Sequence, residues 1–421
     1  MHINELQSRR AALFDKMEDE SFALLFAGKP KCLSADQDYP FESNRNFFYL
    51  TGINQEGSSL LLIKRGAECR EFLFISPYDE TKEKWYGKKL TPEEAKLVSG
   101  VNNVLLTPYL TSRLDRLLRQ GIDEEVPLGL GYFDLSPELK IEEELDVKGF
   151  VGSLRAIYPS LKVIDLAPMV FALRAKKSEA EVNCLKKAIE HTKAGLLRAY
   201  SLIAPGAYEY ELSLGFYQAS QSSNALGGLS FPSIVASGEN GTTLHYPNPQ
   251  SKLKEGDLIL FDVGAKEEGY CGDISRTIPV DGVYSPRQRQ LYEIVLGCNK
   301  AVIGFAKPGI TLRELNAFAR DYLAKRCLQE KVISSYDDID RIYFHSVSHH
   351  IGLDDHDPMD RDKPLEEGNV ISDEPGLYIK EEGIGIRIED DLLITDRGAK
   401  NLSSFIPKEI EEIEHYFAAG R

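Results

Sequence analysis

Two acidic residues flank a turn in the second half of the chain and could bind a cation together. Asp262 ends an apolar run and lies four residues before Lys266, and Asp273 lies four residues after Gly269 of the same KEEG turn. Equal distances from a turn make two residues cross-strand partners in a β-hairpin, with Cβ atoms roughly 5 Å apart. Two such carboxylates repel, and a buried unpaired charge is costly, so a bound cation would relieve both penalties. We therefore expect Asp262 and Asp273 to be cross-strand metal ligands.

A degenerate copy of this hairpin follows later in the chain. The segment LEEGNVISDE at 365–374 echoes LKEGDLILFD at 253–262, and a second KEEG turn occupies 380–383. Glu374 lies six residues before that turn and Glu389 six residues after it, which makes them cross-strand partners as well.

A shorter echo precedes each hairpin. The pattern PG-x4-EL occurs at 205–212 and again at 308–315. Several matches in one order predict an internally duplicated, pseudo-twofold domain, with a metal site on its axis.

Most of the histidines lie near these hairpins. His245 follows the turn-rich loop SGENGTTL, and His345, His349, His350 and His356 crowd into FHSVSHHIGLDDHD. A lone histidine is more often a hydrogen-bonded core residue than a ligand. Four histidines within twelve residues, placed between two carboxylate hairpins, indicate a functional site.

The candidate ligand set is four carboxylates and one histidine. Asp262, Asp273, Glu374 and Glu389 carry a charge of −4, which balances two divalent cations. Oxygen-dominated ligation with one imidazole suits Mn²⁺ or Co²⁺ better than a closed zinc site. Paired metals roughly 3.5–4 Å apart hold and activate a water, so the expected chemistry is metal-assisted hydrolysis. Structural Ca²⁺ would need no histidine cluster, and without metal Arg387 could neutralise only one of the carboxylates.

The composition bounds the class of protein. A chain of 421 residues with 42% hydrophobic and 28% charged residues predicts a globular protein of two domains. The net charge of −16 argues against nucleic acid or an anionic membrane as a partner. The N-terminal residues lack the apolar segment of a signal peptide, and no run approaches the length of a membrane span. Six scattered cysteines without CxxC spacing fit a reducing cytoplasm.

The two domains are expected to divide near residue 172. Residues 1–172 alternate short apolar runs with helical segments, which predicts an α/β (α+β) domain. Residues 173–421 begin with a long amphipathic helix, for which Ser178 and Glu181 form a capping-box signature. The same signature recurs at Thr311 and Glu314.

Two aromatic features of the first domain stand out. The segment ESNRNFFYLTG at 42–52 gathers aromatics beside a turn, and Trp85 is the only tryptophan. We expect both to serve in packing. The alternative is a lip that projects towards the site of a neighbouring subunit.

Five segments together resemble a known metallopeptidase signature: GDLILFDVGA, GYCGDISRTIPV, HSVSHHIGLDDHD, DEPGLYI and GIGIRIEDDLLIT. They look like the five-ligand dimetal motif of the pita-bread metallopeptidases, and within that family they are most similar to the Xaa-Pro aminopeptidases (aminopeptidase P), relatives of prolidase. The resemblance covers about 175–405. More loosely, SNRNFFYLTG and KWYGKKL make 1–165 resemble the creatinase/aminopeptidase-P N-terminal domain. The implied fold is that domain followed by a pseudo-twofold pita-bread catalytic domain.

The resemblance implies a role for each candidate ligand. Asp262 would be a terminal ligand to one metal, Asp273 and Glu389 would bridge two metals, and His349 and Glu374 would complete the second site. The implied cofactors are two divalent metal ions, Mn²⁺ first, with Co²⁺ or Zn²⁺ as alternatives.

The resemblance also implies catalytic residues. His245, His345 and His356 would bind the substrate carbonyl, Arg387 would orient the bridging carboxylates, and Glu374 would shuttle a proton. The chemistry agrees, because the amide nitrogen before proline has no N–H and must be protonated as it leaves.

The implied activity is removal of an N-terminal residue that precedes proline, from peptides of several lengths. Ser346 and His350 depart from the family's usual glycine and bulky apolar residue, and we expect His350 to point into the core. Ser348 before the ligand histidine favours the aminopeptidase over the alternative, a prolidase restricted to dipeptides. A third alternative is a domain that has lost catalysis and only binds, although this chain has lost no ligand. The family also implies a homodimer or a higher homo-oligomer.

Overall fold

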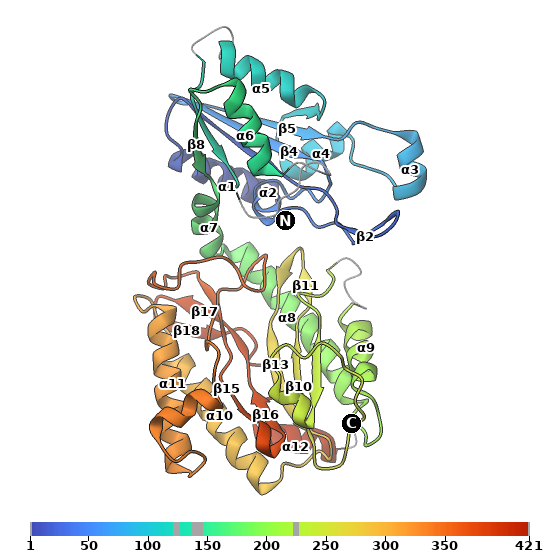
Figure 1. The fold of residues 1–421 in the computed structure, drawn as a ribbon, viewed down its shortest axis with the longest axis vertical. Helices are drawn as coiled ribbons and strands as arrows, with labels where there is room; N and C mark the ends of the chain where they lie inside the picture. The colour runs from blue at the N-terminus through green and yellow to red at the C-terminus, as the bar shows by residue number, and fades with distance from the viewer. Residues whose placement is uncertain (1, 121–126, 136–145, 222–226, 420–421) are drawn as a thin grey trace. The chain divides into compact units, whose positions relative to one another are not determined.

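The chain folds into two compact units of mixed α/β composition (Figure 1). The structure is a computed structural model that describes residues 2–120, 127–135, 146–221 and 227–419. The units comprise Met1–Arg174 and Ala175–Arg421. Helix α7 (Ala167–Ala175) spans the position between residues 172 and 173 at which the sequence places a domain boundary.

The N-terminal unit is built on a six-stranded sheet with the strand order β6-β5-β4-β1-β7-β8. The middle strand β1 is buried at every residue, which fits its apolar sequence SFALLF. Parallel pairing joins β5 to β6, β1 to β7 and β7 to β8, and the remaining pairs are antiparallel. The strands are β1 (Ser21–Phe26), β4 (Ser59–Arg65), β5 (Glu68–Ile75), β6 (Asn103–Leu106), β7 (Leu130–Phe133) and β8 (Lys162–Asp165).

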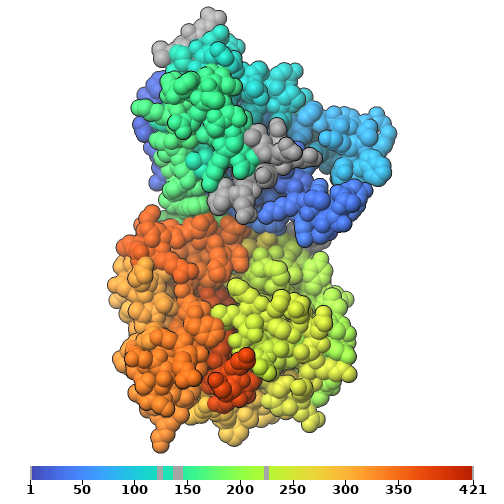
Figure 2. Space-filling view, viewed as in Figure 1, coloured from blue at the N-terminus to red at the C-terminus, as the bar shows by residue number. Residues whose placement is uncertain are grey.

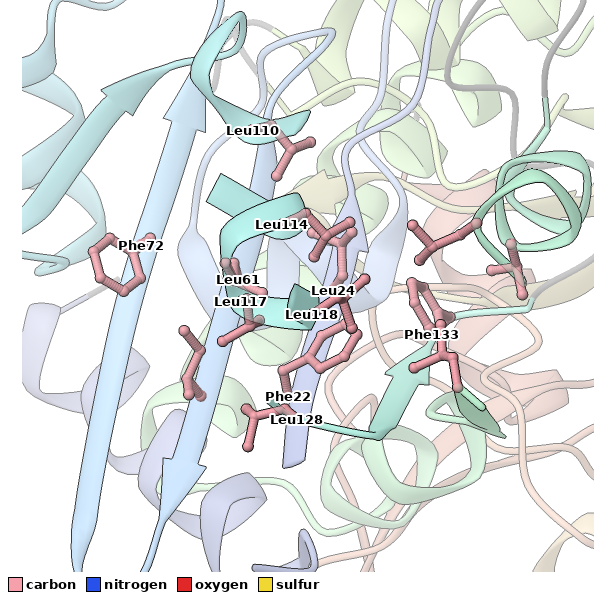
Figure 3. Packing of buried hydrophobic residues seen from close by; sticks show 14 of the residues in the cluster. Phe22, Leu24, Leu61, Phe72, Leu110, Leu114, Leu117, Leu118, Leu128 and Phe133 are labelled. Carbon is pink, nitrogen blue, oxygen red and sulfur yellow. The ribbon is translucent and has the colours of Figure 1, made fainter. Parts of the chain in front are cut away.

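Alternate residues of these strands form the core on one face of the sheet (Figure 3). Phe22 and Leu24 of β1 pack with Leu114 and Leu117 of α5 (Tyr109–Gln120), because side chains two apart on a strand share a face. Helix α6 (Val147–Ile157) contributes to the same cluster. Two further helices, α1 (Ile3–Lys16) and α4 (Pro92–Ser99), pack against each other and against α2 (Arg45–Thr51).

The two aromatic features of this unit behave differently. In the 42–52 segment, Phe47 and Tyr49 of α2 are buried, so the packing prediction is confirmed there. Trp85 lies on the short helix α3 (Glu80–Tyr86) with its side chain 78% exposed. The packing prediction for Trp85 is therefore wrong. A short hairpin of β2 (Cys32–Ser34) and β3 (Gln37–Asp38) completes this unit.

The C-terminal unit repeats one arrangement twice. In the first repeat, Gly206 N donates to Leu253 O, and Leu253 N donates back to Ala207 O, both at 2.8 Å. In the second repeat, the corresponding bonds join residues 309 and 310 to Leu365 at 2.9 and 2.7 Å. The same backbone connection therefore links the PG-x4-EL segment to the hairpin in both halves, and the predicted duplication is confirmed.

Each repeat places a helix pair beside antiparallel strands (Figure 1). The first contains α8 (Glu179–Tyr200), α9 (Glu209–Ser220), β9 (Ile234–Ser237), η1 (Gly238–Thr242), β10 (Leu258–Val263), β11 (Lys266–Glu267), β12 (Tyr270–Cys271) and β13 (Ile274–Pro279). The second contains α10 (Pro286–Phe305), α11 (Leu312–Gln329), η2 (Tyr336–Arg341), β14 (Val370–Asp373), β15 (Gly376–Ile379), η3 (Lys380–Glu382), β16 (Ile384–Arg387), β17 (Asp390–Thr395) and β18 (Gly398–Asn401). Helix α12 (Ile410–Ala418) follows. No helix in the described ranges has the length and apolar character needed to cross a membrane.

Capping boxes start α8 and α11, as the sequence predicts. The Ser178 side chain accepts from Glu181 N, and the Glu181 carboxylate accepts from Ser178 N. Thr311 and Glu314 make the same reciprocal pair at the start of α11. These bonds satisfy N–H groups that have no partner within the helix.

The first hairpin has a different register from the one predicted. Its turn is centred on Glu268 and Gly269, which have φ angles of 48° and 86°. Positive φ at both central residues defines a type I′ turn, which matches the twist of a two-residue hairpin. Asp262 consequently pairs with Ser275 and not with Asp273. The prediction that Asp262 and Asp273 are direct cross-strand partners is wrong, although a two-residue offset keeps both on one face.

The second hairpin has the predicted register. Asp373 pairs with Asp390 and Gly376 pairs with Arg387. The positions of Glu374 and Glu389 lie between these two pairs and oppose each other. The hairpins also meet, because Glu389 N donates to Ser275 O at 3.0 Å.

Candidate active site

A cavity of about 600 Å³ opens in the C-terminal unit. The face drawn in Figure 2 shows a hollow between yellow-green residues of the first repeat and orange residues of the second. All the residues that the sequence singles out as ligands or catalytic groups line this cavity: Asp262, Asp273, Glu374, Glu389, His245, His345, His349, His356 and Arg387. Groups up to 144 residues apart in the chain (245 to 389) are thus brought to one place.

Strand ends deliver the four carboxylates. Asp262 lies near the end of β10, and Asp273 immediately precedes β13. Glu374 immediately follows β14, and Glu389 immediately precedes β17. Because the backbone pairing on either side fixes each strand end, the carboxylates are held by the sheets and not by a loop.

Three of the side chains form a compact group of potential metal ligands. One ligand atom from each of Asp273, His349 and Glu389 lies within 4.8 Å of the other two. The His349 Nε2 atom is 3.5 Å from Asp273 Oδ2 and 3.5 Å from Glu374 Oε1. These separations are too long for strong hydrogen bonds and leave room for a cation among the oxygens and the imidazole.

The backbone selects the tautomer of His349 that suits metal binding. Its Nδ1 atom is 3.1 Å from the carbonyl oxygen of His350 and donates to it. Burial lowers the pKa of His349, which keeps the ring neutral. The Nε2 lone pair therefore faces the carboxylates. A metal-binding histidine usually donates a hydrogen bond from its other ring nitrogen in this way.

Arg387 joins the two repeats at the site. Its Nη2 atom lies 2.7 Å from Asp262 Oδ2, and its Nε atom donates to Ser275 Oγ at 2.8 Å. Ser275 Oγ in turn donates to Glu389 Oε2 at 2.7 Å. Arg387 is 4% exposed, so its charge acts in a medium that screens weakly. One guanidinium thus holds a carboxylate of the first repeat directly and one of the second through Ser275.

The same guanidinium reaches His345 through a tyrosine. Arg387 Nη1 donates to the Tyr378 hydroxyl at 3.0 Å, and that hydroxyl is 2.9 Å from His345 Nε2. His345 Nδ1 donates to Ser346 O at 2.9 Å, so Nε2 accepts the tyrosine proton. Burial, and after it the positive charge of Arg387, lowers the pKa of His345 to about 4. His345 is therefore neutral near pH 7.

Three of these carboxyl groups, Asp273, Glu374 and Glu389, resist ionisation. Burial and the neighbouring acids raise the pKa of Asp273 and of Glu389 well above the ordinary range. Burial raises the pKa of Glu374 to about 8, against a lowering effect of Arg387. The protein therefore supplies too little positive charge to balance these acids. Divalent cations would supply it, and the donor set of four carboxylates and one imidazole fits them.

The remaining histidines take three different positions. His356 stacks on His349 with ring centroids 3.8 Å apart, and burial lowers the pKa of His356. His245 lines the cavity from the opposite repeat. His350 is 3% exposed and lies outside the cavity lining, beside the buried ion pair of Lys177 and Asp357.

Sequence reasoning missed Ser275 and Tyr378. Each lies on the same strand face as a predicted group, since Ser275 is two residues after Asp273 and Tyr378 is four after Glu374. The duplication carried a further signal. Asp262 is equivalent to Glu374 in the two repeats. Ser275 lies opposite Asp262 and Glu389 lies opposite Glu374, so Ser275 and Glu389 occupy equivalent positions.

Known proteins match the whole chain. The family model of metallopeptidase family M24 matches residues 183–396, and that of the aminopeptidase P N-terminal domain matches residues 6–124. The Xaa-Pro aminopeptidase of Escherichia coli (strain K12) is 34% identical, over 99% of this chain and 98% of the relative.

Solved structures agree along the full length. An aminopeptidase P-like protein from Bacillus anthracis superposes with a TM-score of 0.95 at 37% identity, covering 100% of this chain and 99% of that one. Zinc-substituted E. coli aminopeptidase P in complex with product gives a TM-score of 0.90 at 32% identity, with the same coverage. The chain therefore belongs to metallopeptidase family M24, and it combines the catalytic domain of that family with an aminopeptidase P N-terminal domain.

Proposed function

We propose that this protein is a metal-dependent Xaa-Pro aminopeptidase, which hydrolyses the peptide bond between an N-terminal residue and a following proline. The observation that carries the proposal is the convergence of the four candidate carboxylate ligands, four histidines and Arg387 on a single cavity. Full-length similarity to Xaa-Pro aminopeptidases supports this substrate class over that of prolidase.

We infer two divalent metal ions, with Mn²⁺ as the first choice and Co²⁺ or Zn²⁺ as alternatives. Asp262 would hold one ion as a terminal ligand, Asp273 and Glu389 would bridge, and His349 with Glu374 would complete the second. The tight grouping of Asp273, His349 and Glu389 supports the bridging assignment. Bound metal would polarise the substrate carbonyl and lower the pKa of a water at the site.

Glu374 is placed to move a proton. The bond to be cleaved ends on the proline nitrogen, which lacks an N–H and leaves as a secondary amine only after it gains a proton. A carboxyl group beside the scissile bond meets that need, and Glu374 lines the cavity. In the metal-free site burial raises the pKa of Glu374 to about 8. We assign to Glu374 the transfer of a proton from the attacking water to the proline nitrogen.

The histidines and the arginine orient the reactants. His245, His345 and His356 line the cavity, and we assign to them the binding of the carbonyl oxygen of the substrate. Arg387 would hold Asp262 in place, since the two form a 2.7 Å ion pair with side chains 4% and 14% exposed.

The deciding experiment compares an Xaa-Pro dipeptide with an Xaa-Pro-Yaa-Zaa tetrapeptide, each incubated with protein reconstituted in Mn²⁺. We expect cleavage of the tetrapeptide, with or without the dipeptide. Cleavage of the dipeptide alone would identify a prolidase. Bound metal without cleavage of either peptide would identify a binding module.

We further propose a homodimer in a reducing, cytoplasmic setting. All six cysteines are free, which supports the compartment. The exposed indole of Trp85 is the side chain to test at the subunit interface. Light scattering of wild type and Trp85→Ala would give the mass of each, and a monomeric wild type would overturn the dimer.

A further inference from the structure

A buried carboxylate outside the cavity organises one wall of it. Glu209 begins helix α9 and is fully buried. It accepts hydrogen bonds from five neutral donors: Ser237 N at 2.7 Å, Ser237 Oγ at 2.8 Å, Asn240 Nδ2 at 2.9 Å, Ser251 N at 3.0 Å and Tyr246 OH at 3.2 Å. Bonds to a charged acceptor are stronger than neutral ones. A carboxylate with this many donors is therefore a firm anchor.

All five donors belong to one segment, residues 237–251. Ser237 ends β9, which pairs with the Asp262 strand, and Ser251 lies at the far end of the segment. Glu209 N also donates to Ser251 O at 3.0 Å. One side chain and its own backbone thus fasten both ends and the middle of a 15-residue connection.

This segment carries His245 into the cavity. His245, Tyr246 and two flanking residues line the cavity wall. Within the described part of the chain, the His245 ring has no hydrogen bond, so its position depends on the backbone around it. The Tyr246 hydroxyl, on the next residue, is bound to Glu209 at 3.2 Å.

The second repeat has no carboxylate at the equivalent position. The PG-x4-EL segments align Glu209 with Leu312, the first residue of α11. Leu312 is 4% exposed, so the equivalent position of the second repeat is filled by an ordinary apolar side chain. The carboxylate is thus specific to the repeat whose following segment carries His245.

We propose that Glu209 is a positioning residue of the active site, which holds residues 237–251 so that His245 meets the substrate. The inference rests on the proposed function for its kinetic readout. Glu209 touches neither the cavity nor the candidate metal ligands, so its loss should leave metal content unchanged.

The test uses Glu209→Gln in the full-length, metal-loaded protein. The amide keeps the shape of the side chain but replaces one acceptor oxygen with an NH₂ donor. Three of the five hydrogen bonds reach one oxygen of Glu209 and two reach the other, so either three or two of them are lost. We expect kcat/KM for an Xaa-Pro tetrapeptide to fall about tenfold or more, mainly through kcat. This is the effect of other residues that orient active-site groups through hydrogen bonds without contacting the substrate. The matched control is Glu211→Gln on the exposed side of the same helix, which should retain wild-type activity.

A double-variant comparison separates positioning from a merely structural role. In a His245→Ala background, Glu209→Gln should cost less than about twofold, because the group through which it acts is already gone. Equal losses in both backgrounds, or no loss in the wild-type background, would overturn the proposal.

A measurement that does not depend on catalysis distinguishes the anchoring role of Glu209 from the proposed peptidase activity. Hydrogen–deuterium exchange of peptides covering 237–251 should be faster in Glu209→Gln than in wild type and in Glu211→Gln. If wild type cleaves no Xaa-Pro peptide but exchange is still faster in Glu209→Gln, only the proposed function is refuted. Unchanged exchange in Glu209→Gln would refute the anchoring role.

Discussion

The metal-free protein should lose stability as the pH rises, because of Glu374. Burial raises the pKa of Glu374 to about 8, whereas its ordinary value is 4.5. Between these two pH values the unfolded chain releases the proton and the folded chain keeps it, so the free energy of unfolding falls with rising pH. From about pH 5.5 to about pH 7.5 the two pKa values give a loss of about 2.5 kcal/mol.

The assay is thermal or urea unfolding of chelator-treated protein at both pH values. Glu374→Gln is the control, because it removes the titrating carboxyl and keeps the shape. Wild type should lose about 2.5 kcal/mol more than the variant, or about 5–10 °C in Tm for a unit of this size. Parallel changes in the two proteins would refute the assignment of a raised pKa to Glu374, and with it the basis of its proton-transfer role.

Three further changes test the site and its support. Asp262→Asn should lower the amount of bound metal, measured by elemental analysis. It should also reduce kcat/KM by more than about 100-fold, the upper end of the effect of residues that only hydrogen-bond to metal ligands. Full activity would contradict the role of Asp262 as a ligand. Tyr378→Phe breaks the link between Arg387 and His345, so kcat should fall about tenfold at unchanged metal content, and an unaffected kcat would exclude that link from the reaction. Lys177→Met removes the 3.2 Å ion-pair partner of the buried Asp357 and should lower the free energy of unfolding in urea by about 3–5 kcal/mol. The double variant with Asp357→Asn should regain most of that loss, and additive losses would refute the pairing.

The sequence was sufficient to predict residues that line one cavity, because these residues follow short, regular patterns. The KEEG turn at 380–383 fixes the opposition of Glu374 and Glu389, and the strand pairs on either side have that register. The capping boxes at Ser178 and Thr311 depend only on residues three apart, so local rules predict them.

The first hairpin shows where such patterns fail. Its KEEG letters match those of the second hairpin, but the turn is centred one residue later, where Glu268 and Gly269 both have positive φ. Gly269 adopts that conformation readily, whereas Glu268 adopts it at a cost that the adjoining strand pairs must offset. The four-residue KEEG sequence does not determine whether the strand pairs offset that cost, so the predicted partner of Asp262 was wrong.

Contacts between distant segments were also beyond the sequence. Ser275 contacts Arg387 and Glu389, residues more than 110 positions away, through hydroxyl bonds that no spacing rule encodes. The exposure of Trp85 depends on which surfaces the neighbouring elements leave uncovered. Composition favours burial of an indole, but an aromatic side chain at the surface is also common.

The meeting of the two repeats at Ser275 and Glu389 has a mechanical consequence. Each repeat supplies two of the four candidate carboxylate ligands, so bound metal ions would hold the two halves together. A ligand that binds only the joined form stabilises it by RT ln(1 + [L]/Kd), and separation of the halves would first require release of the ions. Cofactor supply would therefore govern how firmly the catalytic unit holds together, as well as how fast it works.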